Sequence, residues 1–328
     1  MKVEGKRIAH CATTFEDSLI GRFVKFAGVS ESSRQTYTKC LKQLFKFFSA
    51  NEITNPSRAD LIDWLNDMKA AGKSASTVQL YLTATKIFFR WLAQEGICQN
   101  IADHMKSGVK PSHNHKKDAL STDQCRNLIE HAAPGNAEMT ARNRAVLSLM
   151  TTAGLRTIEV VRANVGDIRH EHGKIYLAVW GKGHSAADEK VLLAKQTFKA
   201  IREYLSMRKD KIDSNSPLFT STSRSNCGQR LTTQTIRKMC KASLRGIGLD
   251  SPRLTAHSLR HSTATNLIFA GVELPKVQKI LRHKNLNTTM IYAAAWERYQ
   301  NDGEQILADE ILNNSKSPRR FNQRRGRR

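Results

Sequence analysis

Six residues in the second half of the chain have side chains suited to chemistry on a phosphodiester. They are Arg156, Lys182, His257, Arg260, His283 and Tyr292. Each has an ordinary structural explanation by itself, because single arginines often pair with carboxylates and single tyrosines often pack in cores. As a set, the six are a much more specific signal than any one of them.

Phosphoryl transfer needs positive charge on the phosphate and an activated nucleophile. Attack on a DNA phosphate builds negative charge on the non-bridging oxygens, which two guanidinium groups can clamp bidentately where lysine cannot. Arg156 and Arg260 suit this function. A phenol has a pKa of about 10 and attacks poorly until a base or a cationic environment helps its proton leave. We therefore predict Tyr292 as the nucleophile, assisted by His257.

The departing 5′ oxygen needs a proton, and an ammonium group on a hairpin can deliver it. Lys182, in a Gly-Lys-Gly turn, is the predicted general acid, and Lys190 is the weaker alternative. His257 and Arg260 are three residues apart and share one helical face, and Tyr292 lies nine residues after His283 on the following helix.

The first 103 residues are predicted to form a helical domain. Apolar residues recur at helical spacing in about four segments, as in Tyr37, Leu41, Leu44 and Phe48. Capping signals agree with this: Ser57 followed by Asp60, and Ser74 or Ser76 before the next segment. We expect a small bundle whose aromatic faces form the core rather than base-stacking platforms.

Residues 104–118 lose this periodicity and are predicted to be an exposed linker. A second domain over 119–298 then begins at the capping signal Ser121 and Gln124, with helices over 125–132 and 144–152. Residues 174–180 and 190–193 alternate like the two strands of a hairpin with a glycine-rich tip. Further helices are expected at 196–209, 233–245, 257–270, 275–282, 287–295 and 298–312. The predicted fold class is mainly α with a small antiparallel sheet.

Charge indicates a polyanionic partner. The chain carries 53 Lys and Arg against 29 Asp and Glu, a formal net charge of +24. Residues 1–103 contribute +4, residues 104–314 contribute +13, and the tail 315–328, predicted to be disordered, contributes +7. So much positive charge on a folded domain favours a surface shaped around phosphates. No apolar run approaches the roughly 18 residues of a spanning helix, so no membrane partner is expected.

The spacing of cysteines and histidines predicts no metal site. The six cysteines are scattered without the short spacings of zinc sites, which is typical of reduced thiols in a cytosolic protein. His113 and His115 form a pair in a polar stretch without a further ligand nearby, so the pair is not predicted to bind a metal. We expect a cytoplasmic, nucleoid-associated protein.

These motifs resemble those of the tyrosine recombinase family, the phage integrases and Xer-type recombinases, over most of the chain. The run Ala-Gly-Leu-Arg156-Thr-Ile-Glu resembles the family's first arginine motif, and the Gly-Lys182-Gly turn its lysine hairpin. His257-Ser-Leu-Arg260 is similar to its His-x-x-Arg box, Leu-Arg-His283 to its second histidine element, and Tyr292 stands where the nucleophile stands. Two departures are Arg282, where the family often has glycine, and the sequence His-Ser-Ala-Ala-Asp-Glu after the lysine turn.

The resemblance implies a core-DNA-binding domain followed by a catalytic domain that together bind double-stranded DNA. It implies a reaction without a cofactor, a 3′-phosphotyrosine intermediate, four protomers on two DNA sites, and strand exchange through a four-way (Holliday) junction. Residues 299–314 would form a C-terminal helix exchanged between protomers. The alternatives are a type IB topoisomerase, a telomere-resolving enzyme and a catalytically silent DNA-binding regulator. The target sequence and the biological task, such as integration of a mobile element, stay open.

Overall fold

The structure is a computed structural model that describes residues 12–108, 118–180, 189–283 and 303–312. Contacts within the chain divide it into two compact units, residues 1–113 and 114–328. Each unit is described by itself below. No helix in the described ranges is both long enough and apolar enough to cross a membrane.

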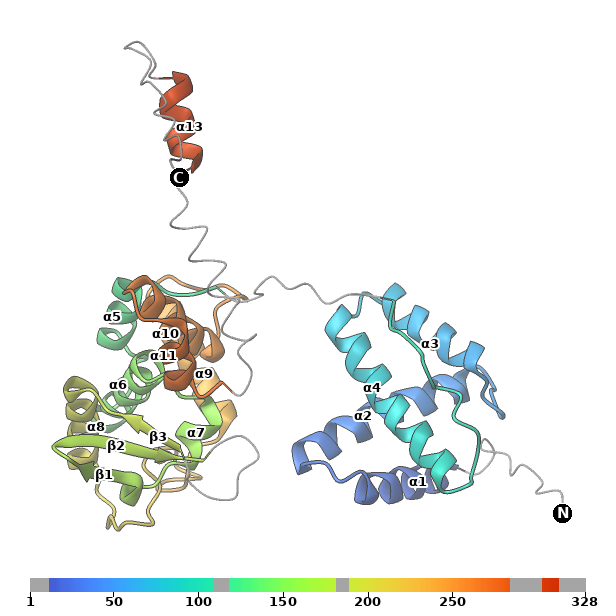
Figure 1. The fold of residues 1–328 in the computed structure, drawn as a ribbon. Coiled ribbons are helices and arrows are strands. Elements are labelled where there is room, and N and C mark those ends of the chain that lie inside the picture. The colour runs from blue at the N-terminus through green and yellow to red at the C-terminus, as the bar shows by residue number, and fades with distance from the viewer. Residues whose placement is uncertain (1–11, 109–117, 181–188, 284–302, 313–328) are drawn as a thin grey trace, which may run out of the picture. The chain divides into compact units, whose positions relative to one another are not determined.

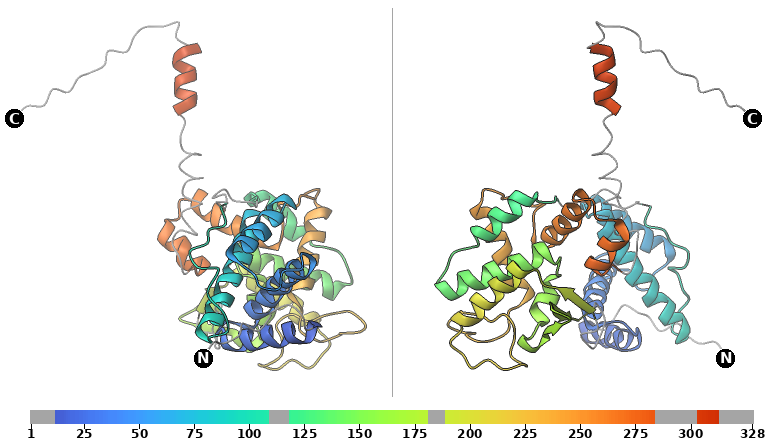
Figure 2. Two further views of the ribbon diagram at one scale, coloured as in Figure 1. Left: turned by 90° about the vertical axis from the view of Figure 1, so that its right-hand side faces the viewer. Right: turned by 60° about the vertical axis from the view of Figure 1, so that its left-hand side comes forward.

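Unit 1 contains the helices α1 (Ala12–Phe26), α2 (Glu31–Ala50), α3 (Arg58–Ala70) and α4 (Ala75–Gln94), drawn in blue to cyan in Figures 1 and 2. Local signals set where two of them begin. Ser57 and Asp60 form a reciprocal capping box at α3, and the Ser74 side chain accepts from the Thr77 backbone amide at α4. The expectation of about four helices with these caps is confirmed.

Aromatic side chains fill the centre of unit 1. Phe23, Phe45 and Phe88 are almost completely buried, and Phe88 meets the other two rings edge-on at centroid distances of 5.3 and 5.8 Å. Such edge-to-face pairs stabilise the core beyond what the burial of their apolar area contributes. These aromatic residues therefore form the core, as predicted. Ala102 and Met105 join the same core, so the chain stays packed on unit 1 beyond α4.

Unit 2 is mostly helical and contains one small sheet. Its elements in chain order are α5 (Thr122–Glu130), α6 (Ala137–Thr152), α7 (Thr157–Arg162), η1 (Val165–Asp167), β1 (Ile168–Glu171), β2 (Lys174–Val179), β3 (Glu189–Leu192), α8 (Lys195–Met207), α9 (Thr233–Gly246), α10 (Ala256–Phe269), α11 (Leu274–Leu281) and α13 (Gly303–Leu312). The capping box of Ser121 and Gln124 begins α5, as expected. The predicted fold class, mainly α with a small antiparallel sheet, is confirmed.

The sheet has three strands in the order β1-β2-β3, both pairs antiparallel (Figure 1). Our expectation of only two strands was wrong, because β1 was missed. Its four residues, Ile-Arg-His-Glu, are all at least partly exposed, so this edge strand lacks the apolar alternation that marks β2. The predicted glycine-rich tip between β2 and β3 lies outside the described residues.

Helix α6 is the centre of unit 2. It packs against α8, α10 and α5, and Leu147 and Leu149 on it are completely buried. The Thr263 hydroxyl of α10 bonds to the backbone carbonyls of Met150 and Thr151 at the end of α6, at 3.2 and 2.8 Å. This contact fixes the start of the Ala-Gly-Leu-Arg segment against the helix that carries His257 and Arg260.

Candidate functional site

Four of the six predicted site residues lie in the described part of the chain. Arg156 precedes α7, His257 and Arg260 lie on α10, and His283 follows α11. Lys182 and Tyr292 lie outside the described residues, so their functions stay predictions. The four described residues are those predicted to bind the phosphate or to assist the nucleophile.

Arg156 is held at the first turn of α7 by a carboxylate. Its Nη1 donates to Oε1 of Glu159 at 2.5 Å, and its backbone amide donates to Oε2 of the same residue at 2.8 Å. Its side chain is 26% exposed. Two of the five guanidinium N–H donors are used within the described residues, one on Glu159 and one on the Arg282 carbonyl, which leaves donors for a phosphate.

The turn before Arg156 requires a glycine at position 154. The residue has φ +60°, and a Cβ placed on it would lie 2.6 Å from Cδ2 of the buried Leu281. Both the backbone conformation and the close approach therefore require glycine. The Ala-Gly-Leu-Arg segment thus packs directly against the end of α11.

Arg260 is almost completely buried, with 3% exposure, and it joins the same two segments. Its Nη1 donates to the Gly154 carbonyl at 2.6 Å, and its Nη2 donates to the Leu281 carbonyl. Arg156 donates through Nη2 to the Arg282 carbonyl at 3.2 Å. The two arginines therefore converge on the C-terminal end of α11, where backbone carbonyls at the negative end of the helix dipole attract cations.

A helix-ending motif places His283 beside both arginines. The backbone amide of Arg282 donates to the Lys279 carbonyl and that of His283 to the Gln278 carbonyl, both at 3.1 Å. The Gln278 side chain also donates to the His283 carbonyl at 3.1 Å. Burial, followed by the positive charges of Arg260, Arg156 and Arg282, lowers the pKa of His283 to about 4. His283 is therefore a neutral ring at neutral pH in the protein without DNA.

We expect the His283 ring to titrate with a midpoint near pH 4, observed by NMR and assigned with a His283→Asn variant. The ordinary histidine pKa is about 6.5, so between these values the unfolded chain binds more protons than the folded one. Stability from this group is therefore complete above about pH 6.5 and is lost as the pH falls towards 4. A midpoint near 6.5 in the folded protein would contradict the described burial beside the arginines.

His257 and the alternative lysine have different surroundings. His257 is exposed in the first turn of α10, and its charge acts on His283, which places it near the arginine pair. Lys190 instead points its ammonium group at both carboxylate oxygens of Glu171 on β1, at 2.7 Å each. Lys190 is thus engaged in an ion pair between two strands of the sheet. This favours Lys182 over Lys190 as the general acid.

Two residues of this site were not among the predicted ones. Glu159 is 1% exposed and pairs with Arg156 and with Arg282, whose Nη2 lies 2.8 Å from Oε2. Burial raises the pKa of the Glu159 carboxyl, but the charge of Arg282 and then the hydrogen bonds and charge of Arg156 hold it below its usual range. Its spacing of three residues after Arg156 is the sequence signal that marks this capping carboxylate.

Arg282 has an unusual backbone for a side chain of its size. It adopts φ +55° and ψ +49°, the left-handed conformation that usually selects glycine after a helix. This conformation costs about 1–2 kcal/mol for a residue with a Cβ. The strain therefore explains why glycine is favoured at such a position.

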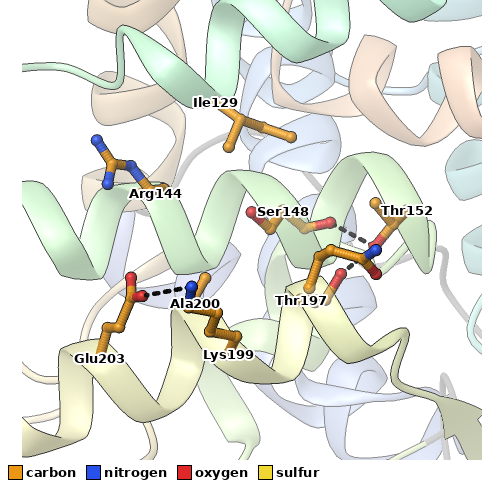
Figure 3. Close-up of a pocket in the computed structure, with 9 residues that line it drawn as sticks. Ile129, Arg144, Ser148, Thr152, Thr197, Lys199, Ala200 and Glu203 are labelled. Carbon is orange, nitrogen blue, oxygen red and sulfur yellow. Dashed lines mark hydrogen bonds and ion pairs between the residues drawn. The ribbon is translucent and has the colours of Figure 1, made fainter.

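A shallow hollow elsewhere in unit 2 is not part of this site. It has a volume of about 260 Å³ and lies between α6 and α8 (Figure 3). Its walls include Ser148 and Thr152, and the Thr152 hydroxyl forms a hydrogen bond with that of Thr197 at 2.9 Å. Lys199 and Glu203, which also line it, form an ion pair at 3.9 Å. None of the four site residues in the described ranges lines it, and its walls come mainly from the two packed helices.

Two family models match the chain. The model described as the phage integrase family matches residues 118–298, and the model of the phage integrase N-terminal SAM-like domain matches residues 24–96. The first match covers more than half of the chain and includes all six predicted site residues. The second falls within unit 1.

Curated relatives of similar length are tyrosine recombinases. XerD of Oceanobacillus iheyensis is 28% identical over 275 residues, which is 81% of this chain and 88% of the relative. XerC of Alcanivorax borkumensis is 30% identical over 225 residues, 67% of this chain and 69% of the relative.

Solved structures share the fold. The XerH site-specific recombinase bound to a palindromic difH substrate superposes with a TM-score of 0.68 at 23% identity, covering 90% of this chain and 84% of that one. A lambda integrase dimer bound to a core site gives 0.62 at 16% identity, covering 82% and 95%. At these identities the similarity supports the fold alone.

Proposed function

Because the chain belongs to the phage integrase family, we propose that it is a tyrosine site-specific recombinase that cleaves and rejoins double-stranded DNA. The observation that supports this most is the convergence of Arg156 and Arg260 on the end of α11, directly beside His283. A cationic pair next to a neutral imidazole matches what a phosphodiester needs when its non-bridging oxygens gain negative charge.

The proposed reaction begins when the Tyr292 oxygen attacks the scissile phosphorus. A bond forms between this oxygen and phosphorus, the bond from phosphorus to the 5′ oxygen breaks, and Lys182 gives that oxygen a proton. His257 assists the loss of the phenolic proton, while Arg156, Arg260 and His283 hold the phosphate. The product is a 3′-phosphotyrosine link and a free 5′ hydroxyl, which attacks the equivalent link on a partner duplex. The phosphoester bond is conserved in the protein–DNA link, so no nucleotide hydrolysis is needed.

The experiment that tests this function uses a duplex with a nick close to the cleavage site, found by mapping covalent cleavage in DNA flanking the gene. We expect an SDS-resistant protein–DNA adduct that accumulates at an undiminished rate in EDTA, because arginine and lysine supply the positive charge. A catalytically silent regulator would bind this DNA without an adduct. Loss of cleavage in EDTA with recovery in magnesium would indicate a metal-dependent nuclease. A topoisomerase would form the adduct on one duplex but would not join two.

We further propose that four protomers assemble on two DNA sites and exchange α13. Its ten residues form a helix too short to be stable alone, and none of its side chains is buried. Ile306, Leu307, Ile311 and Leu312 are between 56% and 79% exposed. An exchange from each protomer to the next is heterologous and closes into a ring, which suits a cyclic assembly.

Truncation after Gly303 removes this apolar surface and should abolish joining of two duplexes, measured as a synaptic complex by gel shift, while single-site binding persists. Removal of residues 315–328 alone is the matched control. It removes seven basic groups and should weaken DNA binding in a salt-dependent way without loss of synapsis. Normal recombination by the protein truncated after Gly303 would refute the exchange.

A further inference from the structure

Arg282 combines two features that rarely occur together. Its backbone is left-handed, and its long charged side chain is only 5% exposed. A residue chosen only to end a helix in this conformation would be glycine or asparagine. The side chain must therefore contribute something that offsets the backbone strain, and its contacts indicate what this is.

The guanidinium of Arg282 lies between two carboxylates from different elements. Nη2 donates to Oε2 of Glu159 on α7 at 2.8 Å, and Nε lies 3.5 Å from Oε2 of Glu189, the first residue of β3. Nη1 donates to the Ile280 carbonyl at 2.8 Å, which holds the guanidinium against its own helix end. Arg282 thus connects α7, α11 and the strand that follows the predicted lysine hairpin.

Glu159 links this arginine to the phosphate site. One of its oxygens accepts from the Arg156 side chain, and the other accepts from Arg282 and from the Arg156 backbone amide. A carboxylate held on both oxygens has one orientation, so the guanidinium that it holds has one orientation too. The carbonyl of Arg282 also accepts directly from Arg156 at 3.2 Å.

We propose that Arg282 is a positioning residue, which fixes Arg156 through Glu159 and ties strand β3 to the end of α11. This inference rests on the proposed function. Arg282 does not touch the phosphate in this account. It sets the geometry of the arginine that does, and it couples that arginine to the strand returning from the hairpin of Lys182.

The ionisation of Glu159 gives a readout that a purely structural function would not change. Among the described residues, the charges acting on Glu159 come from Arg282 and Arg156, while Glu189 and His283 lie against Arg282. Removal of Arg282 takes away the larger favourable charge, so the carboxyl should bind a proton at higher pH and release Arg156. The loss in cleavage rate should therefore grow as the pH falls from 8 to 5.5.

Four variants separate the contributions. Arg282→Gly relaxes the backbone and removes the whole side chain, and Arg282→Lys keeps one positive charge that cannot reach both carboxylates in fork geometry. Glu189→Gln removes only the tie to β3. The matched control is Glu171→Gln, which breaks the ion pair of the neighbouring strand residue Lys190 on the β1 side and leaves Arg282 untouched.

Single-turnover adduct formation on the nicked duplex is the measurement, with DNA affinity and thermal unfolding recorded for each variant. We expect Arg282→Gly to slow adduct formation about tenfold to a hundredfold at pH 7.5 with DNA affinity within a few-fold. Arg282→Lys should recover part of this loss, Glu189→Gln should lose less, and Glu171→Gln should match the original protein. Arg282→Gly added to Glu159→Gln should cause little further loss, because both act through one carboxylate.

The possible outcomes are distinct. Wild-type rates and an unchanged pH profile in Arg282→Gly would overturn the inference alone, since the original protein still forms the adduct. A loss that disappears once the rate is corrected for the folded fraction would also overturn it. Absence of the adduct with the original protein would refute the proposed function and this inference with it.

Discussion

Tyr292→Phe should abolish the covalent protein–DNA adduct on the nicked duplex, with a loss of at least roughly four orders of magnitude. The variant lacks only the phenolic oxygen, and no other group in the account forms a bond to phosphorus. DNA affinity should stay within a few-fold, because the phosphate contacts proposed for Arg156, Arg260 and His283 would remain. The measurement is adduct formation by denaturing gel beside a binding titration.

Tyr299 offers a matched control for this change. It lies seven residues further along the chain and has no function in the account, so Tyr299→Phe should form the adduct at the original rate. An SDS-resistant adduct in Tyr292→Phe together with its loss in Tyr299→Phe would show that Tyr299, and not Tyr292, is the nucleophile.

Arg156→Lys should slow cleavage by about two orders of magnitude or more. Lysine keeps the charge but lacks the planar guanidinium. In Arg156 this group donates to Glu159 through Nη1 and still has further N–H donors for a phosphate. Partial exposure of this side chain, at 26%, makes a folding defect smaller than at the buried Arg260. Single-turnover cleavage rates measure the effect.

Arg245→Lys is the control for the loss of a guanidinium in general. Arg245 on α9 forms an exposed ion pair with Asp250 at 3.0 Å. Exposed ion pairs contribute little to the stability of the fold. Its cleavage rate should equal that of the original protein. If Arg156→Lys cleaves equally fast, Arg156 is only the ion-pair partner of Glu159.

Local signals in the sequence predicted most of the fold. The starts of α3, α4 and α5 depend on a serine and a residue three positions later, so the sequence around each start is sufficient. Strand β1 was missed because its pairing with β2 lies in backbone hydrogen bonds, while its exposed residues carry no apolar pattern. The six-residue helix α7 is likewise too short to show a period.

Residue types in the sequence indicated the proposed chemistry, but they did not indicate the arrangement of the site. Arg282 and Glu159 are separated by 123 positions, and nothing near either residue indicates that they pair. Arg282 was noted only as a departure from a glycine, and its left-handed backbone and its two carboxylate partners became evident from the structure. The low pKa of His283 also depends on burial first and then on the charges of arginines from three separate segments, none of which is visible in the sequence around it.

The most direct test of whether Tyr292 is the nucleophile is to identify the amino acid attached to DNA. The protein is reacted with the nicked duplex, the adduct is digested with nuclease and protease, and the modified peptide is sequenced by mass spectrometry. We expect a nucleotide 3′-phosphate on the Tyr292 oxygen, in the peptide between Lys284 and Arg298. Attachment at any other residue, or cleaved DNA with a free 3′ end and no modified peptide, would contradict it.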